Sequence, residues 1–479
     1  MKNYDTMKVK LFLPGIVSLV ALTFWMLSCQ GMAGEGHRIE LFVADKADSE
    51  TYLAYHYGNR QYLQDTTFFD ATGFAVFEGA ENLTRGLYLI VFDDDNSFEV
   101  IIDDNQHFSV YVTAEDIMGS IRFENSPEND VFYSYLHFIT EKTRERRQVD
   151  EELRAQGVAR DRQVTLQNRM QELDTLVREK QNQIIADDPN SLLAIILLGQ
   201  REPELPEFPP LPDGSQDTDA MYRMYKSMFF ENIDFTDPRI LFTPVYHSRL
   251  SVYFNNVLIQ NPDTIIIEAD RILEKARAND EFFRYTIWFL ANNAERSQIM
   301  GMDRVFVHLI DNYYATGEVY WIDEERRQRL VQRADNMRRL LIGNTAPNIT
   351  IFDTEDRPVS LHSIEAEYLI VYFWDSECAF CRQAAPVLKE AYRNLRDEGI
   401  QIFAINTETN KNRWLNALKD YPDTWVHGQD VTNRSGFREI YDIFAIPQIF
   451  ILNREKQILA KDIGPEHVER FIRQVILTQ

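Results

Sequence analysis

A Cys-x-x-Cys pair at the end of an apolar strand constrains this chain more than any other feature. The β-rich run Tyr368–Tyr372 leads through Phe373-Trp374 to Cys378 and Cys381. Apolar residues then recur at helical spacing: Ala384, Val387, Leu388, Ala391, Tyr392 and Leu395. The first cysteine therefore lies at a helix N-terminus, where free N–H groups and the helix dipole favour a thiolate. The second follows one turn later, within reach of a mixed disulfide, which is the arrangement of a thiol–disulfide exchanger.

A structural zinc site is the alternative use of such a pair. Structural zinc takes four ligands, usually as two pairs. The chain has three cysteines in all, so only Cys29 remains, and no His-x-x-x-His pair is present. The cysteine count and the strand–turn–helix context together favour redox exchange over metal binding.

Length and charge limit the number of domains and the kinds of binding partner. A chain of 479 residues predicts roughly two to four domains. A net charge of −25 argues against nucleic acid and against tight binding to anionic lipid heads, and favours a well-solvated surface. With three cysteines there is no disulfide framework.

The first residues predict an export signal over residues 1–28. Lys2, Lys8 and Lys10 precede the uncharged run Leu11–Leu27, which is short for a membrane-spanning helix. The closing Leu-Ser-Cys resembles a bacterial lipobox, which implies that Cys29 is lipidated and becomes the mature N-terminus. An ordinary cleaved signal with an incidental cysteine is the alternative.

Two details of this segment depart from the usual pattern. Met26 stands where a lipobox usually has leucine, and Met7 is a second candidate start. Residues 29–37, rich in glycine and small residues, predict a flexible tether. No later segment is long and apolar enough to span a membrane.

Residues 38–125 predict an antiparallel β-sandwich or barrel. Short runs rich in Tyr, Phe, Val and Ile alternate with Asp-, Asn- and Gly-rich turns: Thr51–Tyr57, Phe74–Phe77, Leu87–Phe92, Phe98–Ile102 and Phe108–Val112. The acidic turns are candidate calcium ligands, but Asp and Asn are the ordinary turn residues and no twelve-residue ligand loop is present. The order of these motifs resembles the small β domain that precedes thioredoxin-like domains in Bacteroidetes lipoproteins.

Residues 126–340 predict an all-α domain that begins near Pro127. The charged segment 141–185 predicts a helical hairpin with a break near Gly157, and the proline-rich segment 202–217 predicts a loop. Further helices are expected over 190–195, 221–230, 247–260, 264–278, 281–298, 303–316 and 324–341. Single histidines in this region, His137, His247 and His308, favour core or surface positions over metal ligation because no partner residues accompany them.

Residues 341–479 predict an α/β domain. The expected order is a β pair (349–352 and 358–361), strand 368–374, helix 378–396, strand 400–406, helix 411–421, helix 435–444, a hairpin (448–452 and 458–461) and helix 465–477. Pro447 opens the hairpin strand, where a proline must occupy an edge or another special position because it cannot donate to a ladder.

This order and its motifs resemble the thioredoxin-like domains of the TlpA/ResA/AhpC-TSA-type superfamily. The resemblance is carried by Phe373-Trp374 before Cys378, by the Cys-x-x-Cys, by Ile446-Pro447 and by the opening Gly343-Asn-Thr-Ala-Pro. The whole chain resembles a Bacteroidetes thioredoxin-family lipoprotein. The expected fold class is multidomain α+β: a β-sandwich-like domain, an all-α domain and a C-terminal α/β thioredoxin fold.

The resemblance implies roles for individual residues. Cys378 would be the attacking thiolate and Cys381 the resolving thiol, while Trp374 would pack beneath the active-site loop. Pro447 would be a cis-proline opposite the cysteines, with Ile446 offering backbone groups to a substrate strand. Glu408 would match the acid that membrane-anchored reductases of this group place near the cysteines.

Two departures from thioredoxin leave the redox poise open. Tyr372 stands where thioredoxin has a buried aspartate, and Ala379-Phe380 replaces Gly-Pro between the cysteines. Asp375 and Glu377 flank the pair, and their negative charge opposes the thiolate that the helix terminus favours.

The leading hypothesis is a lipid-anchored thiol–disulfide oxidoreductase of the cell envelope that faces the periplasm. It would reduce disulfides in exported proteins, with cytochrome c maturation as one candidate process, and draw electrons from a membrane donor. It would need no cofactor beyond the redox-active Cys378–Cys381 pair and no metal. A binding protein whose β and helical domains recruit a partner, and a disulfide oxidase or isomerase, are the alternatives. A peroxidase is disfavoured because that class typically lacks this pair.

Overall fold

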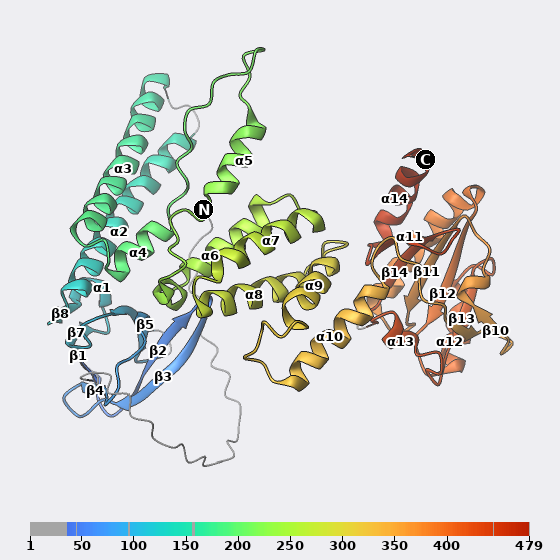
Figure 1. The fold of residues 1–479 in the computed structure, drawn as a ribbon, viewed down its shortest axis with the longest axis horizontal. Coiled ribbons are helices and arrows are strands. Elements are labelled where there is room, and N and C mark those ends of the chain that lie inside the picture. Colours follow the sequence, from blue (N-terminus) through green and yellow to red (C-terminus); the bar gives the residue numbers. More distant parts are fainter. Residues whose placement is uncertain (1–35, 45, 94–95, 156–158, 444, 479) are drawn as a thin grey trace. The chain divides into compact units, whose positions relative to one another are not determined.

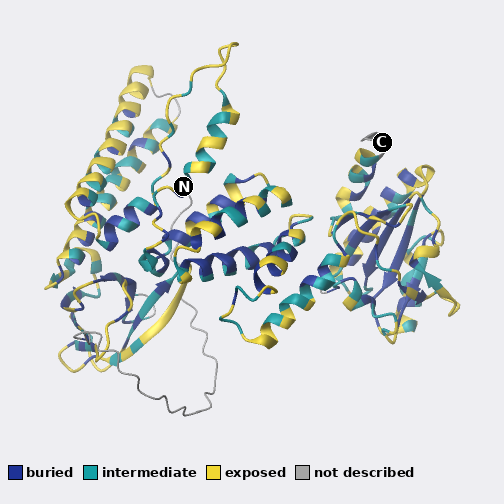
Figure 2. Cartoon of the chain, viewed as in Figure 1, coloured by how far each residue is buried: buried dark blue, intermediate teal, exposed yellow. Residues whose placement is uncertain are grey.

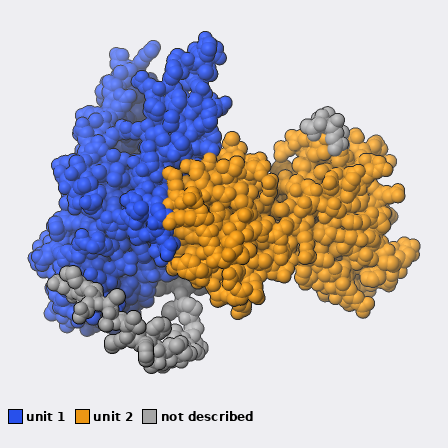
Figure 3. Space-filling view, viewed as in Figure 1, with its two compact units in different colours: residues 1–257, 278–282 blue, residues 258–277, 283–479 orange. Residues whose placement is uncertain are grey.

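The computed structural model describes residues 36–44, 46–93, 96–155, 159–443 and 445–478. The chain divides into two compact units (Figure 3). Unit 1 comprises residues 1–257 and 278–282, and unit 2 comprises residues 258–277 and 283–479. The predicted signal, tether and lipidation site at Cys29 lie outside the described residues, except for Gly36 and His37.

Unit 1 begins with two four-stranded sheets in its described part (Figure 1). The strands are β1 (His37–Ala44), β2 (Glu50–Tyr57), β3 (Arg60–Phe68), β4 (Phe74–Gly79), β5 (Gly86–Val91), β6 (Ser97–Ile102), β7 (His107–Thr113) and β8 (Arg122–Glu124). One sheet has the order β4-β1-β7-β8 and the other β3-β2-β5-β6. Alternate residues of both sheets, such as Ile39 and Leu41 of β1 and Val100 of β6, enter one shared core.

The prediction of β-structure in the N-terminal region is confirmed, but the prediction of a purely antiparallel arrangement is wrong. Strand β1 pairs antiparallel with β4 and parallel with β7. A parallel pair needs a long crossover connection, here the chain from β2 to β6. Local turn signals indicate hairpins and carry no information on such a distant pairing. Strand β1 also begins at His37, one residue before the expected start of the β region.

Helices follow the sheets in unit 1. They are α1 (Ile117–Ser120), α2 (Pro127–Arg154), α3 (Arg160–Asp187), α4 (Leu192–Gly199), α5 (Thr218–Met228), the 3-10 turn η1 (Pro238–Phe242), and α6 (Val245–Val252) with the π turn η2 (Tyr253–Val257). The predicted hairpin is formed by α2 and α3, with Leu166, Leu173 and Ile184 buried on α3. Pro127 occupies the first turn of α2, where its missing N–H costs nothing.

One buried side chain joins α2 to the sheets. Asn129 is fully buried, accepts from Ile101 N–H at 2.8 Å and donates to Ile101 C=O at 2.8 Å. Its amide also donates to Ser126 Oγ at 2.8 Å. Asn129 thereby completes the backbone hydrogen bonding of β6 at a position where no further strand pairs with it.

Unit 2 contains a second set of helices. They are α7 (Pro262–Ala276), α8 (Asp280–Glu295) from Phe283 onward, α9 (Asp303–Leu309) with the π turn η3 (Ile310–Tyr314), and α10 (Glu324–Arg339). The helical region expected over 126–340 is thus divided between the two units. In the described chain, no helix has the length and apolar character needed to cross a membrane.

A seven-stranded mixed sheet forms the rest of the described part of unit 2, in the order β10-β9-β13-β12-β11-β14-β15. Its elements are β9 (Thr350–Phe352), β10 (Pro358–Ser360), η4 (Leu361–Ser363), β11 (Tyr368–Trp374), α11 (Ala379–Leu395), η5 (Arg396–Glu398), β12 (Ile400–Asn406), α12 (Lys411–Ala417), η6 (Leu418–Asp420), β13 (Val426–Gln429), α13 (Phe437–Ile440), β14 (Gln448–Asn453), β15 (Ile458–Lys461) and α14 (Pro465–Thr478). Strand β11 is buried along its whole length because helices and loops cover both faces of the sheet (Figure 2).

The sequence predicted β11 and β12 at their observed bounds but missed β13. That strand contains His427 and Gly428, which do not indicate a strand. A Cβ at Gly428 would lie 2.2 Å from Ile351 Cδ1, so glycine lets β9 and β13 approach. Helix α13 is also shorter than the expected 435–444.

We predict that Asn129→Ala destabilises unit 1, because Ile101 N–H and C=O would lose their partners while buried. The expected loss is about 2–4 kcal/mol in free energy of unfolding. Urea unfolding, with amide exchange at Ile101, measures it. Glu151→Ala, at an exposed position of the same helix, is the matched control. An unchanged urea midpoint in Asn129→Ala contradicts this prediction.

Candidate active site

Cys378 lies where β11 passes into α11, as the N-cap residue of that helix. Its Sγ accepts a hydrogen bond from Cys381 N–H at 3.1 Å, so sulfur satisfies one of the free donors of the first turn. Cys378 is partly exposed, whereas Cys381 is fully buried, and both are free thiols. The expected strand–turn–helix placement of the pair is confirmed.

The surroundings of Cys381 also change its acidity. Burial raises the pKa of Cys381 far above that of a free thiol, and the contact with Cys378 raises it further. Cys381 is therefore a protonated, sheltered thiol at neutral pH. The half-exposed Cys378 is the thiol that a second molecule can reach.

The Ile446–Pro447 peptide lies against Cys378. The peptide bond is cis, as expected from the sequence. Cys378 Sγ–H donates to Ile446 C=O over 3.6 Å. Both Ile446 and Pro447 are partly exposed, so this part of the loop beside the reactive sulfur is accessible from outside.

An aromatic cluster lies behind the pair. The buried Trp374 ring is parallel to Tyr372, with centroids 6.4 Å apart, and packs on Tyr421 at 4.4 Å. Its carbonyl accepts from Thr407 N–H at 2.8 Å. Tyr372 donates to Cys381 C=O at 3.1 Å, and burial raises the pKa of Tyr372 well above its usual value. A neutral phenol thus occupies the position expected for an acid in thioredoxin.

Glu408 is held at the C-terminal end of β12 and is nearly buried. Its carboxylate accepts from Ser376 Oγ–H, and its carbonyl accepts from Gln429 Nε2 at 2.8 Å. Burial raises the pKa of Glu408 and the neighbouring Asp375 adds to this, while Ser376 and Arg413 act in the opposite direction. The structure therefore brings Glu408 to the turn that carries Asp375 and Ser376.

The rim of the site combines charge with an exposed aromatic ring. Phe380, between the cysteines, is 70% exposed. Glu377 pairs with Arg413 at 2.6 Å, and Arg382 donates to Ser376 C=O at 3.0 Å. The helix N-terminus thus carries an apolar side chain next to Cys378, flanked by a partly neutralised acidic turn.

The sequence did not identify Ser376, Tyr421 or Gln429 as site residues. Ser376 was within the motif, and its position two residues before Cys378 was the available signal. Tyr421 and Gln429 reach the site only through the fold, since α12 and β13 bring them back to the end of β11.

Other predicted positions lie apart from this site. His308 Nε2–H donates to the Asp270 carboxylate at 2.8 Å, and Tyr313 donates to the same carboxylate at 2.7 Å. Within the residues that the structure describes, no group of three His, Cys, Asp or Glu side chains converges as metal ligands.

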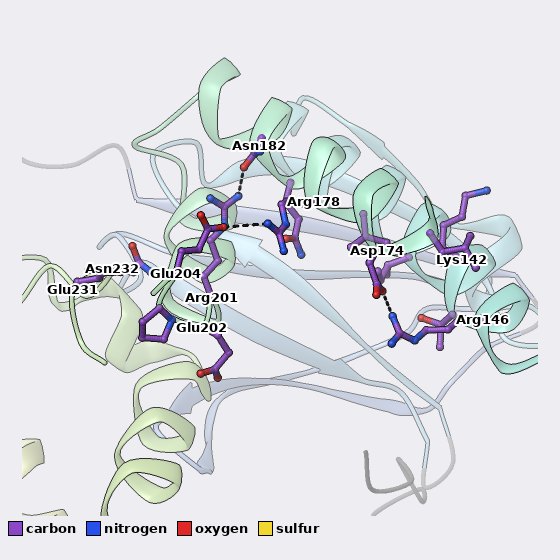
Figure 4. Close-up of a pocket in the computed structure, with 16 residues that line it drawn as sticks. Lys142, Arg146, Asp174, Arg178, Asn182, Arg201, Glu202, Glu204, Glu231 and Asn232 are labelled. Carbon is purple, nitrogen blue, oxygen red and sulfur yellow. Dashed lines mark hydrogen bonds and ion pairs between the residues drawn. The ribbon is translucent and has the colours of Figure 1, made fainter. Parts of the chain in front are cut away.

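Unit 1 contains a separate groove of about 820 Å³ (Figure 4). It lies between the α2–α3 hairpin and the segments 201–204 and 231–232. Arg146 pairs with Asp174, and Arg178 pairs with Glu204 at 3.2 Å. Arg201 donates to Asn182 at 2.6 Å. Leu173, Val177 and Ile139 provide apolar lining, so the groove combines charged and apolar side chains.

Comparison with known proteins concerns mainly the C-terminal part of the chain. Residues 342–461 match the AhpC/TSA family. The thiol-disulfide oxidoreductase ResA of Bacillus cereus is 22% identical over 142 residues, which cover 29% of this chain and 80% of that protein. The matched segment contains the site described above.

Two solved structures are also similar. A thioredoxin-like protein from Bacteroides caccae is 18% identical, with a TM-score of 0.47, and the match covers 57% of this chain and 99% of that one. A domain of a possible thiol-disulfide isomerase from Cytophaga hutchinsonii is 34% identical, with a TM-score of 0.28, and the match covers 29% of this chain and 95% of that one.

We predict that iodoacetamide modifies Cys378 at least roughly tenfold faster than Cys381 in the reduced chain at neutral pH, because only Cys378 is accessible and Cys381 is held as a thiol. Peptide mapping by mass spectrometry at timed intervals gives both rates. The same experiment in urea should make the two rates similar. Equal rates in the folded chain would contradict the geometry.

A second prediction concerns the pH dependence of stability through Glu408. Because the folded-state pKa is raised, Glu408 contributes most to stability below its unfolded value of 4.5 and loses that contribution as pH rises through the folded pKa. Glu408→Gln, which can still accept from Ser376, should therefore become more stable relative to the unmodified chain as pH increases from about 4 to 8.

Urea unfolding at several pH values measures this difference. Glu390→Gln, at an exposed position of α11, should show no such trend. If the stability of Glu408→Gln relative to the unmodified chain stays constant or falls as pH rises, the charged form of Glu408 is not destabilised by its surroundings, and the prediction is wrong.

Proposed function

We propose that this chain, whose C-terminal domain is an AhpC/TSA-type thioredoxin-like oxidoreductase, reduces disulfides in exported proteins through Cys378 and Cys381. The observation that carries the proposal is the asymmetry of the pair. Cys378 is half-exposed at a helix N-terminus and contacts the Ile446 carbonyl, whereas Cys381 is buried one turn away.

The reaction proceeds by two exchanges. The Cys378 thiolate attacks one sulfur of the client disulfide, so that a Cys378–client disulfide forms and the other client sulfur leaves as a thiolate. Cys381 then loses its proton and attacks Cys378 Sγ, which forms the Cys378–Cys381 disulfide and expels the second client thiolate. The client gains two electrons and two protons, and the chain loses them.

Each neighbouring group has a part in this proposal. The helix N-terminus stabilises negative charge on Cys378. We assign Glu408, whose pKa is raised by burial, the role of accepting a proton when Cys381 is deprotonated. The partly exposed Ile446–Pro447 segment beside Cys378 offers backbone hydrogen-bonding groups to an extended client segment.

The direction of electron flow distinguishes the reductant from an oxidase or isomerase. A reductant needs an upstream electron donor that reduces the Cys378–Cys381 disulfide again after each turnover, and a thiol donor on the membrane side fits this chemistry. The similarity to ResA, a thiol-disulfide oxidoreductase, supports exchange in general. The reductive direction is our inference.

Location follows from the first residues. The lysine-rich start, the uncharged run and the Leu-Ser-Cys before residue 30 support a lipid anchor at Cys29 in the cell envelope, with the redox domain facing the periplasm. The net charge of −25 is consistent with a client-binding role that involves no nucleic acid.

A second candidate function is partner binding by unit 1, with redox exchange as a secondary activity. The groove beside the α2–α3 hairpin favours it, since Arg178 and Arg201 lie there together with polar side chains (Figure 4). In this function a partner would be retained without a covalent bond to Cys378.

We predict that Cys381→Ala traps clients in cells as mixed disulfides with Cys378, because the resolving thiol is absent. Dithiothreitol should release them, and Cys378→Ser/Cys381→Ala should trap none. In vitro, Cys378→Ser should lower insulin reduction by at least about 100-fold. Non-reducing electrophoresis and an insulin turbidity assay provide the readouts.

Two results would contradict this function. Full insulin reduction by Cys378→Ser would exclude Cys378 as the nucleophile. A strong non-covalent pull-down with no mixed disulfide in Cys381→Ala would favour partner binding instead.

A further inference from the structure

A buried ion pair joins the helices of unit 2 to its sheet. Lys461, at the end of β15, contacts the carboxylate of Asp303, the first residue of α9. The two side chains are only 8% and 12% exposed. Because both charges have left water, removal of either partner leaves the other uncompensated, unlike the loss of an exposed pair.

Further charges converge on the same face. Arg333 of α10 pairs with Glu295 of α8 at 2.7 Å. Asp442 is partly buried and has a left-handed backbone (φ 53°). Its pKa is raised overall, mainly by burial and further by the nearby charges of Asp462 and Glu295. Arg333 and Lys461 oppose this rise. Helices α8 and α10, strand β15 and the segment before Ile446 thus place charged groups near one another.

This charged face adjoins the backbone that contacts Cys378. Asp462, directly after Lys461, accepts from Gln448 Nε2 at 2.8 Å. Gln448 directly follows Pro447, and Ile446 accepts the hydrogen bond from Cys378. Lys461 is also the direct cross-strand partner of Phe450 on β14. Strand β15 therefore connects Asp303 with the loop 445–448 beside the active site.

The covalent connection between the helices and the sheet is ordered as well. Leu340, at the end of α10, belongs to the apolar core of the sheet domain. Gly343 N–H donates to Ile458 C=O at 2.8 Å, and Ile458 N–H donates to Asn344 C=O at 2.9 Å. The chain from α10 is thus hydrogen-bonded to the first residue of β15, and the helices do not join the redox domain through a free linker.

We propose that the helical segment 283–341 is a working part of the redox module, with Asp303 and Lys461 as positioning residues that hold the loop 445–448 in place to receive an extended, disulfide-bearing protein segment. This inference rests on the proposed reduction of protein disulfides. It assigns the helices of unit 2 a role in client binding at the Cys378 site.

If Asp303 and Lys461 position the loop 445–448, their loss should weaken the reaction with protein clients but not the reaction with small thiol reagents. A client segment must contact the loop backbone before its disulfide reaches Cys378. Iodoacetamide needs only access to the sulfur. Loosening the loop therefore raises KM for a protein disulfide and leaves kcat and the alkylation rate of Cys378 nearly unchanged.

The test uses the full chain and insulin as the protein disulfide. Asp303→Asn and Lys461→Met should each raise KM about fivefold, with kcat changed by less than about twofold. The charge-swapped D303K/K461D retains an ion pair and should recover most of the lost affinity. Arg304→Ala, which removes the adjacent, exposed Arg304–Asp263 pair, is the matched control and should leave KM unchanged.

Amide exchange gives a second readout that does not depend on turnover. In Asp303→Asn, peptides that cover residues 445–450 should exchange faster, while peptides that cover β11 should exchange as before. The inference is overturned if KM and amide exchange are both unchanged in the single variants. It is also overturned if the charge swap recovers none of the lost affinity. Either result leaves the proposed function standing. An unmodified chain that does not reduce insulin overturns the proposed function and this inference with it.

Discussion

The hydrogen bond from Cys381 N–H to Cys378 Sγ is the contact on which the chemistry depends. It exists because β11 ends one loop before α11 begins, so that a sulfur occupies the N-cap position, where helix donors lack backbone partners. The same turn of helix carries Cys381 into the core, where burial holds it as a thiol. One local geometry therefore separates the reachable sulfur from the sheltered one.

The surroundings of this pair differ from a minimal thioredoxin site in the position of the acid. Tyr372 replaces an acid behind Cys381 with a neutral hydroxyl, while Glu408 carries a carboxyl with a raised pKa from the end of the neighbouring strand β12. The phenol and the carboxyl thus come from two strands that lie side by side in the sheet. Phe380 adds an apolar surface next to the reactive sulfur, and this suits a protein client better than a small polar one.

Local sequence signals predicted most of the redox domain. Strands β11 and β12 could be predicted because their apolar residues are continuous. The special position of Pro447 at the start of its strand could be predicted because proline has no N–H to donate to a strand ladder. The parallel pairing of β1 with β7 and the short strand β13 were missed, since both depend on partners distant in sequence. The Asp303–Lys461 pair joins residues 158 positions apart. No local sequence pattern indicates this ion pair. The pair links Asp303, which precedes the expected start of the redox domain at residue 341, to the sheet of that domain.

The reduction potential of the Cys378–Cys381 pair tests the central claim most directly. Equilibration of the full chain with glutathione or dithiothreitol buffers, followed by thiol trapping and mass analysis, gives the midpoint. A reductant of exported disulfides should have a two-electron midpoint near the value of about −270 mV known for thioredoxin. A midpoint near −120 mV, typical of a disulfide-forming oxidant, would contradict the reductive direction, and the absence of any Cys378–Cys381 disulfide would contradict the exchange chemistry itself.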